Sequence, residues 1–326
     1  MHIPDGVLDP RVAVATSLVG GAGFLYAIKR LNHARTERTT VLMGTTAAFL
    51  FAAQMVNFPV GPGVSGHLLG GVLASALLGP WAGMVVIATV LMVQCVLFGD
   101  GGLTALGANF INMGLIGAGG GYAIQASLRR AISGPRGTLL AVIAAAWFSV
   151  ILASGAFAVE LALGGRVQDF PSILTWMALV HAGIGVGEAL ITGGVVRYVL
   201  LRRPDLLEIA DGDAEADRTR GRRATEAVLA GLVVALAVAV FLAPFASEFP
   251  DGLEFVGSRL GFLSDSPGLM PAPIPDYELK WPGFEHARIA TALAGLVGTL
   301  VVFVVGWGMA QALPAPGKRG VAADVV

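Results

Sequence analysis

Long apolar runs alternate with short polar segments along the whole chain. About 20 residues of helix cross the hydrocarbon core of a bilayer, and most of the runs have this length. Each run therefore predicts a membrane-spanning helix. One run is short, about 20 Å as a helix, and Gly79-Pro80 separates it from the next run. The predicted helices cover residues 11–31, 39–58, 67–79, 80–98, 104–126, 138–163, 173–201, 225–246 and 289–312.

Lysine and arginine gather in alternate polar segments, and such segments lie on the cytoplasmic side of membrane proteins. The basic segments are 29–38, 127–137, 202–223 and the C-terminal tail with Lys318 and Arg319. With all four inside, the nine helices thread without conflict, with the N-terminus outside and the C-terminus in the cytoplasm. The opposite segments, which are poor in lysine and arginine, are 59–66, 99–103, 164–172 and 247–288.

Composition agrees with this pattern. Only 13% of the 326 residues are charged and 55% are hydrophobic, whereas a soluble chain carries roughly 25% charge. The net charge of −1 does not indicate a nucleic-acid partner. No basic segment precedes the first apolar run and no small-residue cleavage site follows it, so we expect Met1 to be retained. The sequence predicts an all-α, multi-pass membrane protein.

One long charged stretch, 202–224, interrupts the apolar pattern. Its composition is typical of a solvated linker. We expect it to separate a seven-helix unit, residues 1–201, from a C-terminal unit, residues 225–326. The second unit has two helices and a long outer loop rich in proline and glycine.

Three potential metal-binding features lie on the outer side in this topology: the Met1 amine, His2 and His67. The amine, the deprotonated amide nitrogen of His2 and its imidazole can chelate one ion, which leaves a fourth corner for His67. Four nitrogens in a plane suit Ni(II) or Cu(II), whereas Mg(II) and Ca(II) prefer oxygen ligands. The alternative is that Met-His occurs by chance and that His67 is an interfacial histidine.

Four polar residues near these features are candidates for supporting the ligands. Asp5 lies in a Pro-Asp-Gly turn and can hold a ligand as a hydrogen-bond acceptor. Ser65 lies in the loop that leads to His67, and Asn57 and Asn109 lie near the outer helix ends.

Two ionisable residues, His181 and Glu188, lie seven apart in one apolar run and so share a helix face. Ionisable groups at this depth indicate function. A buried structural pair is an equally good interpretation.

Sequence motifs of nucleotide binding and hydrolysis are missing. The glycines at 117–121 lie within a predicted helix and follow no strand, and there is no Walker lysine motif. There is also no HExxH or GxSxG motif. We therefore predict neither an ATP site nor catalytic residues. A planar four-nitrogen site is also a poor Lewis acid, because catalytic metals keep an open position.

Four segments resemble the CbiM/NikM family, the substrate-specific S components of energy-coupling factor transporters for cobalt and nickel. They are MHIPDGVL at the N-terminus, GPGVSGHLLGG around His67, FGDGGLTALGANFINMG at 98–114 and HAGIGVGEALITG at 181–193. In the C-terminal unit, FPDGLEFV at 249–256 and the pair Asp276-Tyr277 are similar to the small NikN-type PDGLE component. The chain resembles a fused NikM–NikN protein.

The resemblance implies a seven-helix bundle into which the N-terminus is inserted, with Ni(II) or Co(II) bound as substrate by Met1, His2 and His67. It also implies a transmembrane coupling (T) component and ATP-binding subunits as partners, in a bacterial or archaeal cytoplasmic membrane. Pro4-Asp5 favours nickel over cobalt. The alternative is a stand-alone secondary metal transporter, driven by protons through His181 and Glu188.

Overall fold

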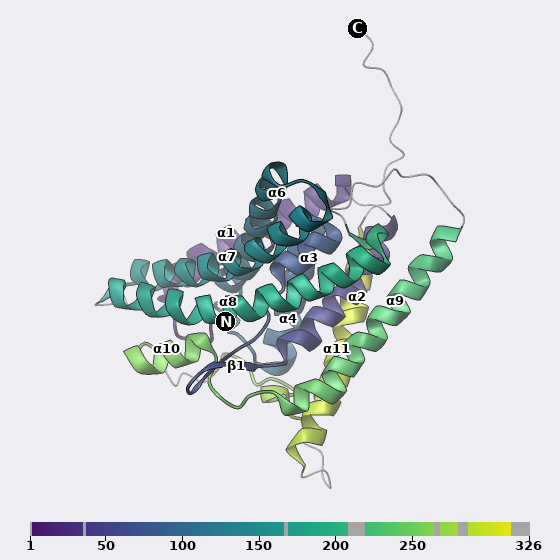
Figure 1. The fold of residues 1–326 in the computed structure, drawn as a ribbon. Helices are drawn as coiled ribbons and strands as arrows, with labels where there is room; N and C mark the ends of the chain where they lie inside the picture. Colours follow the sequence, from purple (N-terminus) through teal and green to yellow (C-terminus); the bar gives the residue numbers. More distant parts are fainter. Residues whose placement is uncertain are drawn as a thin grey trace.

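A computed structural model describes residues 2–34, 37–165, 169–207, 219–263, 268–279 and 286–313. Helices make up most of this part of the chain (Figure 1). The N-terminal elements are α1 Pro10–Ala34, α2 Glu37–Gln54, β1 Phe58–Gly61, β2 Val64–Gly66, α3 Gly71–Leu78, α4 Pro80–Val93, η1 Gln94–Phe98, α5 Leu106–Asn109, η2 Phe110–Gly120, α6 Gly121–Ala131, α7 Gly134–Leu163, α8 Phe170–Arg202 and η3 Pro204–Leu206. The C-terminal elements are α9 Thr219–Ala237, η4 Val238–Leu242, η5 Ala243–Phe245, α10 Gly252–Leu260, η6 Pro275–Tyr277 and α11 Ala287–Ala312.

Six helical segments are long and apolar enough to cross a membrane in the described part of the chain. They are Pro10–His33, Pro80–Phe98, Gly134–Leu163, Phe170–Arg202, Glu226–Phe245 and Ala287–Ala312. A seventh apolar helix, Leu42–Gln54, is shorter. Large apolar side chains such as Leu18, Leu163 and Phe241 point outward and are more than two-thirds exposed. Such a surface is stable against lipid rather than water.

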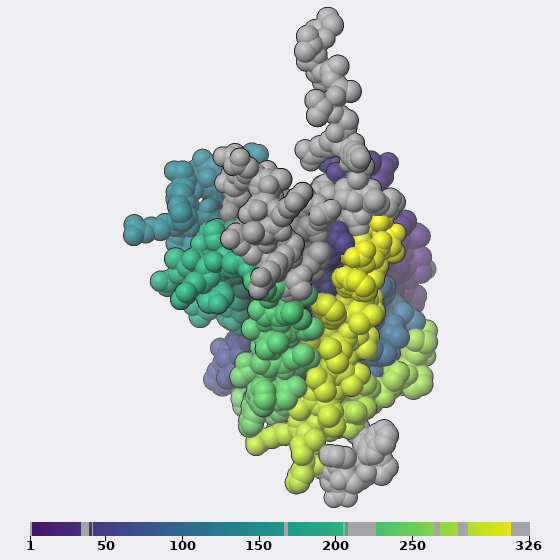
Figure 2. Space-filling model, turned by 90° about the vertical axis from the view of Figure 1, so that its right-hand side faces the viewer, coloured from purple at the N-terminus to yellow at the C-terminus, as the bar shows by residue number. Residues whose placement is uncertain are grey.

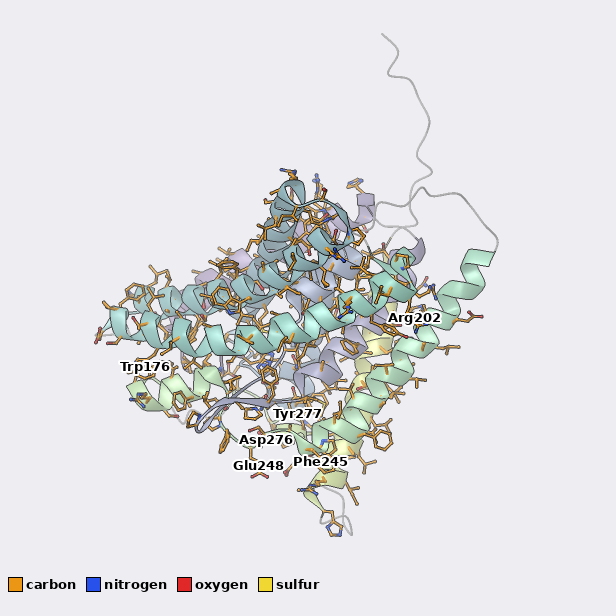
Figure 3. All side chains as sticks on the ribbon, in the orientation of Figure 1. Trp176, Arg202, Phe245, Glu248, Asp276 and Tyr277 are labelled. Atoms are coloured by element: carbon orange, nitrogen blue, oxygen red, sulfur yellow. The ribbon has the colours of Figure 1, made fainter. Side chains whose placement is uncertain are left out.

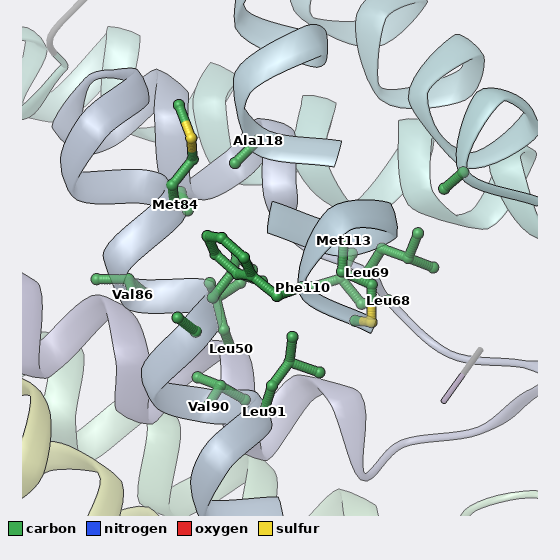
Figure 4. Packing of buried hydrophobic residues seen from close by; sticks show 14 of the residues in the cluster. Leu50, Leu68, Leu69, Met84, Val86, Val90, Leu91, Phe110, Met113 and Ala118 are labelled. Atoms are coloured by element: carbon green, nitrogen blue, oxygen red, sulfur yellow. The ribbon is translucent and has the colours of Figure 1, made fainter. Parts of the chain in front are cut away.

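The short helix α3 forms the centre of the bundle. It packs against α4, η2 and α7, and every residue in it except Leu77 is buried. Close approach explains the small residues here: a Cβ on Gly71 would lie 2.5 Å from the backbone carbon of Gly117 in η2. Figure 4 shows the apolar packing around this centre, where Met113 and Phe110 of η2 lie against residues of α4 and of the segment before α3.

Helices α9 and α11 of the C-terminal unit lie side by side on one face of the molecule (Figure 2). Both pack against α2. The helix pair is therefore attached to the bundle along its length. The remainder of the C-terminal unit crosses one end of the molecule, where α10 lies beneath α8 and close to the β1–β2 hairpin (Figure 1).

Four loop segments that are far apart in sequence meet at that end. Ser65 pairs with Pro250, Asn57 with Ser247, and Leu97 with Ile274 through main-chain hydrogen bonds of 2.8 to 2.9 Å. Gly102 donates to the carbonyl of Ile3 over 2.8 Å. Figure 3 shows Glu248, Asp276 and Tyr277 together here, at the opposite end from Arg202.

Several predicted boundaries are wrong. The helix predicted over 39–58 ends at Gln54, and residues 58–66 form an antiparallel hairpin that the all-α prediction missed. Pro59 and Pro62 lack the N–H that a helix needs, and Gly63 takes a positive φ of 72° in the turn. Helix α3 begins at Gly71 and not at 67. The reason is that Gly70 has φ 77° and that the buried Glu188 carboxylate accepts from the amides of Leu69 and Gly70. The break at Gly79-Pro80 is confirmed.

The structure describes both ends of the predicted linker 202–224. Helix α8 runs to Arg202, η3 follows, and α9 begins at Thr219, because the arginines at 220, 222 and 223 are good helix formers. Residues 208–218 and the C-terminal tail lie outside the described residues. The outer loop also contains the helix α10, which the sequence analysis did not predict.

Candidate metal site

The N-terminal segment enters the bundle instead of extending from it. His2, Ile3 and Val7 are buried. The side chain of Asn109 binds the main chain of Ile3 at both groups: the Ile3 amide donates to Oδ1 over 2.8 Å, and Nδ2 donates to the Ile3 carbonyl over 3.1 Å. Asn109 therefore holds the residue next to His2 much as a neighbouring strand would. Met1 lies outside the described residues.

Asp5 fixes the turn that follows. Its Oδ1 accepts hydrogen bonds from the amide and hydroxyl of Thr104, and its Oδ2 accepts one from the Leu269 amide over 3.1 Å. Burial raises the pKa of Asp5, but the hydrogen bonds from Thr104 and Leu269 lower it by more, so the pKa lies below its usual value. Asp5 thus anchors the inserted segment to both units, and its described contacts are with these donors rather than with the histidine rings.

His2 and His67 lie face to face. Their ring centroids are 5.0 Å apart and their planes differ by 7°, although 64 residues separate them in sequence. Both side chains are at least nine-tenths buried. The Nδ1 atom of His2 is 3.1 Å from Oδ1 of Asp100. On the other side, Nε2 of His67 is 3.6 Å from Oδ2 of Asp251. Each imidazole thus faces one carboxylate.

Asp100 is itself held by the C-terminal unit. Tyr277 donates its hydroxyl to Oδ2 of Asp100 over 2.5 Å, and its ring stacks on Phe98 at 4.6 Å. Tyr277 has φ 56°, a left-handed conformation that is costly for a residue with a Cβ. Burial raises the pKa of Asp100, but His2 and Tyr277 outweigh it and hold the pKa well below its usual value.

Asp251 begins helix α10. Its Oδ1 accepts hydrogen bonds from the amides of Leu253 and Glu254, and the Asp251 amide donates to Oε2 of Glu254. Together these bonds form a complete capping box. Ser65 joins this segment to the hairpin, because its amide donates to Pro250 and its hydroxyl to Phe249. Burial opposes ionisation of Asp251, but its partners, His67 among them, hold its pKa well below the usual value.

His181 and Glu188 are both fully buried on α8, but their hydrogen bonds run to different partners. Glu188 accepts from the amides of Leu69 and Gly70 over 2.5 and 2.8 Å, so it fixes the segment that follows His67. Nδ1 of His181 lies 2.8 Å from the Met177 carbonyl. No hydrogen bond joins the two side chains within the described residues.

The sequence analysis singled out His2, His67, Asn109 and Asp5, and the structure places all four in this region. Ser65 lies here as well, whereas the described contact of Asn57 is the main-chain bond to Ser247. Asp100, Asp251 and Tyr277 were missed as site residues. Asp251 carried a readable signal, because Asp-x-x-Glu before an apolar residue is a capping box. For Asp100 and Tyr277 the contact depends on how the two units pack.

The donors present restrict how an ion can bind. The described residues contain no group of three or more His, Cys, Asp and Glu side chains arranged to hold a metal. Two histidines alone are too few ligands for a transition metal. An ion between His2 and His67 would therefore need further donors, and main-chain nitrogens are donors only for a metal that binds nitrogen strongly.

A membrane protein with a buried, histidine-bearing N-terminus is the class that this fold and site define. The family model described as "Cobalt uptake substrate-specific transmembrane region" (CbiM) matches residues 2–206, and the PDGLE domain model matches residues 225–314. The chain belongs to the CbiM family and carries a PDGLE domain. The resemblance predicted from the sequence motifs and the multi-pass membrane class are confirmed.

Similar proteins share this two-part organisation. The "Putative fused nickel transport protein NikMN" of Archaeoglobus fulgidus is 36% identical over 320 residues, which is 95% of this chain and 98% of that protein. The "Fused nickel transport protein NikMN" of Rhodobacter capsulatus is 30% identical and covers 98% of this chain and 99% of its own. A crystal structure of a transition metal transporter superimposes with a TM-score of 0.57 at 30% identity, over 63% of this chain and 94% of its own.

Proposed function

We propose that this chain is the substrate-binding membrane component of an ATP-driven nickel (or cobalt) uptake transporter, and that it has no enzymatic activity of its own. The observation that carries the proposal is the burial of His2 against His67 at 5.0 Å by an N-terminal segment inserted into the bundle. The names of the two fused relatives support nickel as the substrate.

The proposed ligands are the Met1 amine, the amide and imidazole nitrogens of His2, and Nε2 of His67. A chelate through the amine and the amide closes on Nδ1 of His2, and that atom now faces Asp100. A half-turn of the ring about its Cβ–Cγ bond releases Nδ1 and brings Nε2 toward the same carboxylate. Asp100 then binds the ring nitrogen that the metal leaves free, an arrangement that orients metal-binding histidines.

The same proposal includes the topology of nine crossings, with the N-terminus outside and the C-terminus in the cytoplasm. The meeting of His2, the hairpin, Asp100 and Asp251 at one end of the molecule supports it, because the threading assigns all four to the outer face. Arg202 lies at the opposite end (Figure 3), where the basic segments belong. Residues 1–201 are then the S component and 225–326 the PDGLE unit.

Uptake in this scheme needs partners. The chain carries no Walker lysine motif, so a separate T component and ATP-binding subunits would supply coupling and hydrolysis in the cytoplasmic membrane. The metal is captured at the outer face and released inside after a reorientation that the partners drive. The structure does not favour a stand-alone proton-coupled transporter, because Glu188 is occupied by two backbone amides.

Metal analysis of purified protein tests the ligand set. We expect the full chain to bind one nickel or cobalt ion, and expect His2→Ala and His67→Ala each to abolish stoichiometric binding. His33→Ala is the matched control, since His33 is exposed at the opposite end of α1. Nickel retained at full stoichiometry by both His2→Ala and His67→Ala would contradict the site.

Vesicles test the coupling. Vesicles that contain the chain with its ATPase partners should accumulate radioactive nickel only when ATP is supplied. Equal uptake by the chain alone, driven by a proton gradient, would instead establish the secondary transporter.

A further inference from the structure

A groove lies between α8 of the N-terminal unit and α9 of the C-terminal unit. These two helices form its walls, α2 forms its floor, and its cavity volume is about 610 Å³. Helix α9 packs against α2 and α11, whereas the main neighbour of α8 is α7. Because the walls pack against different neighbours, the groove follows the boundary between the two units.

Small and apolar side chains form both walls. They are Gly194, Val195, Tyr198 and Val199 on α8, and Ala227, Ala230, Gly231 and Val234 on α9. Tyr198 is 67% exposed and Val234 is 50% exposed, so the groove is open to the surroundings of the molecule. Both helices are long and apolar enough to cross a membrane. At this depth the groove is therefore in contact with acyl chains rather than with water.

The groove has the depth of one leaflet of a bilayer. On α8 it extends from Gly194 to Arg203, which is roughly 14 Å at about 1.5 Å per residue. On α9 it extends from Glu226 to Val234, which is roughly 12 Å. Half of a hydrocarbon core of about 30 Å is about 15 Å. An acyl chain that enters at the carboxyl end of α8 therefore has room along the depth of its leaflet.

The charged side chains that line the groove lie at one end, where α8 stops. Arg203 and Glu226 line it there, and Arg202 lies next to Arg203 at an exposed position (Figure 3). Two guanidinium groups and one carboxylate give this rim a net positive charge. Guanidinium groups match the geometry of phosphate oxygens, and basic pockets between membrane helices bind the headgroups of anionic lipids. The charge and the apolar walls together fit a phospholipid.

We propose that an anionic glycerophospholipid occupies this groove, with one acyl chain between α8 and α9 and its phosphate beside Arg202 and Arg203. The lipid belongs to the leaflet on the side of Arg202, which the proposed topology makes the cytoplasmic one. It fills the space between the two units and so stabilises the docking of α9 on the bundle. The groove end with the arginines is opposite the candidate metal site, so the proposal is independent of the metal ligands.

The lipid is tested on the purified full chain. Protein in mild detergent is stripped of lipid, and phosphatidylglycerol or phosphatidylcholine with the same acyl chains is added back. Native mass spectrometry measures the affinity and the number of lipids bound to each chain. A basic side chain near anionic lipid contributes a factor of about five. We therefore expect phosphatidylglycerol to bind at least fivefold more tightly than phosphatidylcholine and to raise the unfolding temperature by more.

Two pairs of variants separate the headgroup from the acyl chain. Arg202→Gln combined with Arg203→Gln removes both guanidinium groups, and Arg130→Gln is the matched control, because Arg130 is exposed in the last turn of α6. Ala230→Phe fills the groove from an exposed position. Its control, Leu229→Phe, places the same ring at the adjacent position of α9, which is 58% exposed and does not line the groove. Without lipid, each variant should unfold near the temperature of the unaltered stripped chain.

We expect the double arginine variant to bind the two lipids with equal affinity and Ala230→Phe to bind both at least tenfold more weakly. Both controls should behave as the unaltered chain does. Equal affinity of the unaltered chain for the two lipids would overturn the proposal, and so would a control that loses as much affinity as its partner variant. A dimeric mass that Ala230→Phe converts to the mass of one chain would also overturn it, because a second copy would then fill the groove.

Discussion

At the scale of single residues, the histidines are held by side chains that bind the backbone or the opposite edge of a ring. Asn109 binds both main-chain groups of Ile3. Glu188 accepts from the amides of Leu69 and Gly70, which lie two and three residues after His67. Asp100 faces His2 and is held by Tyr277. In metal sites, supports of this kind orient the ligand rings, and losing one typically costs about 10–100-fold in metal affinity.

Asn109→Ala removes both bonds to Ile3: the buried Ile3 amide loses the Asn109 acceptor, whereas the Ile3 carbonyl keeps the bond from the Gly102 amide. A buried unsatisfied group costs about 1–3 kcal/mol, so we expect nickel affinity to fall at least tenfold and amide exchange at residues 3–8 to accelerate. Asn112→Ala is the control, since its equally buried amide binds Glu160 instead. It should lower thermal stability without changing exchange in the N-terminal segment. Equal protection of residues 3–8 in both variants would contradict the role of Asn109.

The sequence singled out His2 and His67 as candidate ligands because a terminal amine followed by histidine has a chemistry of its own. Asp100 and Tyr277 lie in segments that the family resemblance singled out, but no local chemistry assigned either side chain to the site. Their pairing joins residues 177 positions apart and exists only because η6 of the C-terminal unit reaches η1 of the N-terminal unit. Asp251 could have been found as a helix cap, but its contact with His67 depends on the pairing of Ser65 with Pro250.

At the scale of elements, long apolar runs specify helices well and short polar segments specify the site poorly. Helices α7, α8, α9 and α11 lie over their predicted runs, because bilayer-length hydrophobic stretches permit little else. The strands β1 and β2 of the hairpin have four and three residues, and helix α10 has nine. Both are stabilised by contacts with each other and with α8, which no periodicity in the sequence encodes.

A pair of glycine substitutions separates packing from backbone strain at this end of the molecule. Gly252→Ala places a Cβ 2.6 Å from Ile184, whereas Gly63→Ala has nothing within 4 Å and strains only a backbone at φ 72°. We expect Gly63→Ala to cost about 1 kcal/mol and to leave nickel affinity unchanged. Gly252→Ala should cost about 1–3 kcal/mol and weaken nickel binding, because it displaces the start of α10. Thermal unfolding and metal titration of both variants measure this, and equal nickel affinities would show that α10 does not support the site.

At the scale of the whole molecule, the two units are joined twice. Helices α9 and α11 pack along α2 (Figure 2), and the outer loop crosses the site end. The helix interface also supports the site, because Phe98 is in contact with α11 on one side and stacks with Tyr277 on the other. Docking of α11 therefore helps to position the hydroxyl that holds Asp100.

Gly298→Val tests this connection. A Cβ there would lie 2.3 Å from the Phe51 ring and 2.7 Å from the Phe98 ring, whereas a Cβ on Gly308 of the same helix meets nothing within 4 Å. We expect Gly298→Val to destabilise the chain by about 1–3 kcal/mol and to weaken nickel binding several-fold. Gly308→Val should do neither. Nickel affinity that stays constant in Gly298→Val despite a lower unfolding temperature would show that the site is independent of this interface.

The central claim is that the free amine of Met1 is a metal ligand, and two added residues test it with every side chain intact. Two glycines placed before Met1 move the amine by two residues and convert the Met1 nitrogen into an amide. One added residue is not enough, because an amine, two amide nitrogens and the His2 imidazole would then complete a new four-nitrogen chelate. The account predicts that purified protein with this extension loses stoichiometric nickel, while the native N-terminus retains one ion per chain. Nickel bound by the extended chain at the same stoichiometry and affinity would contradict the account.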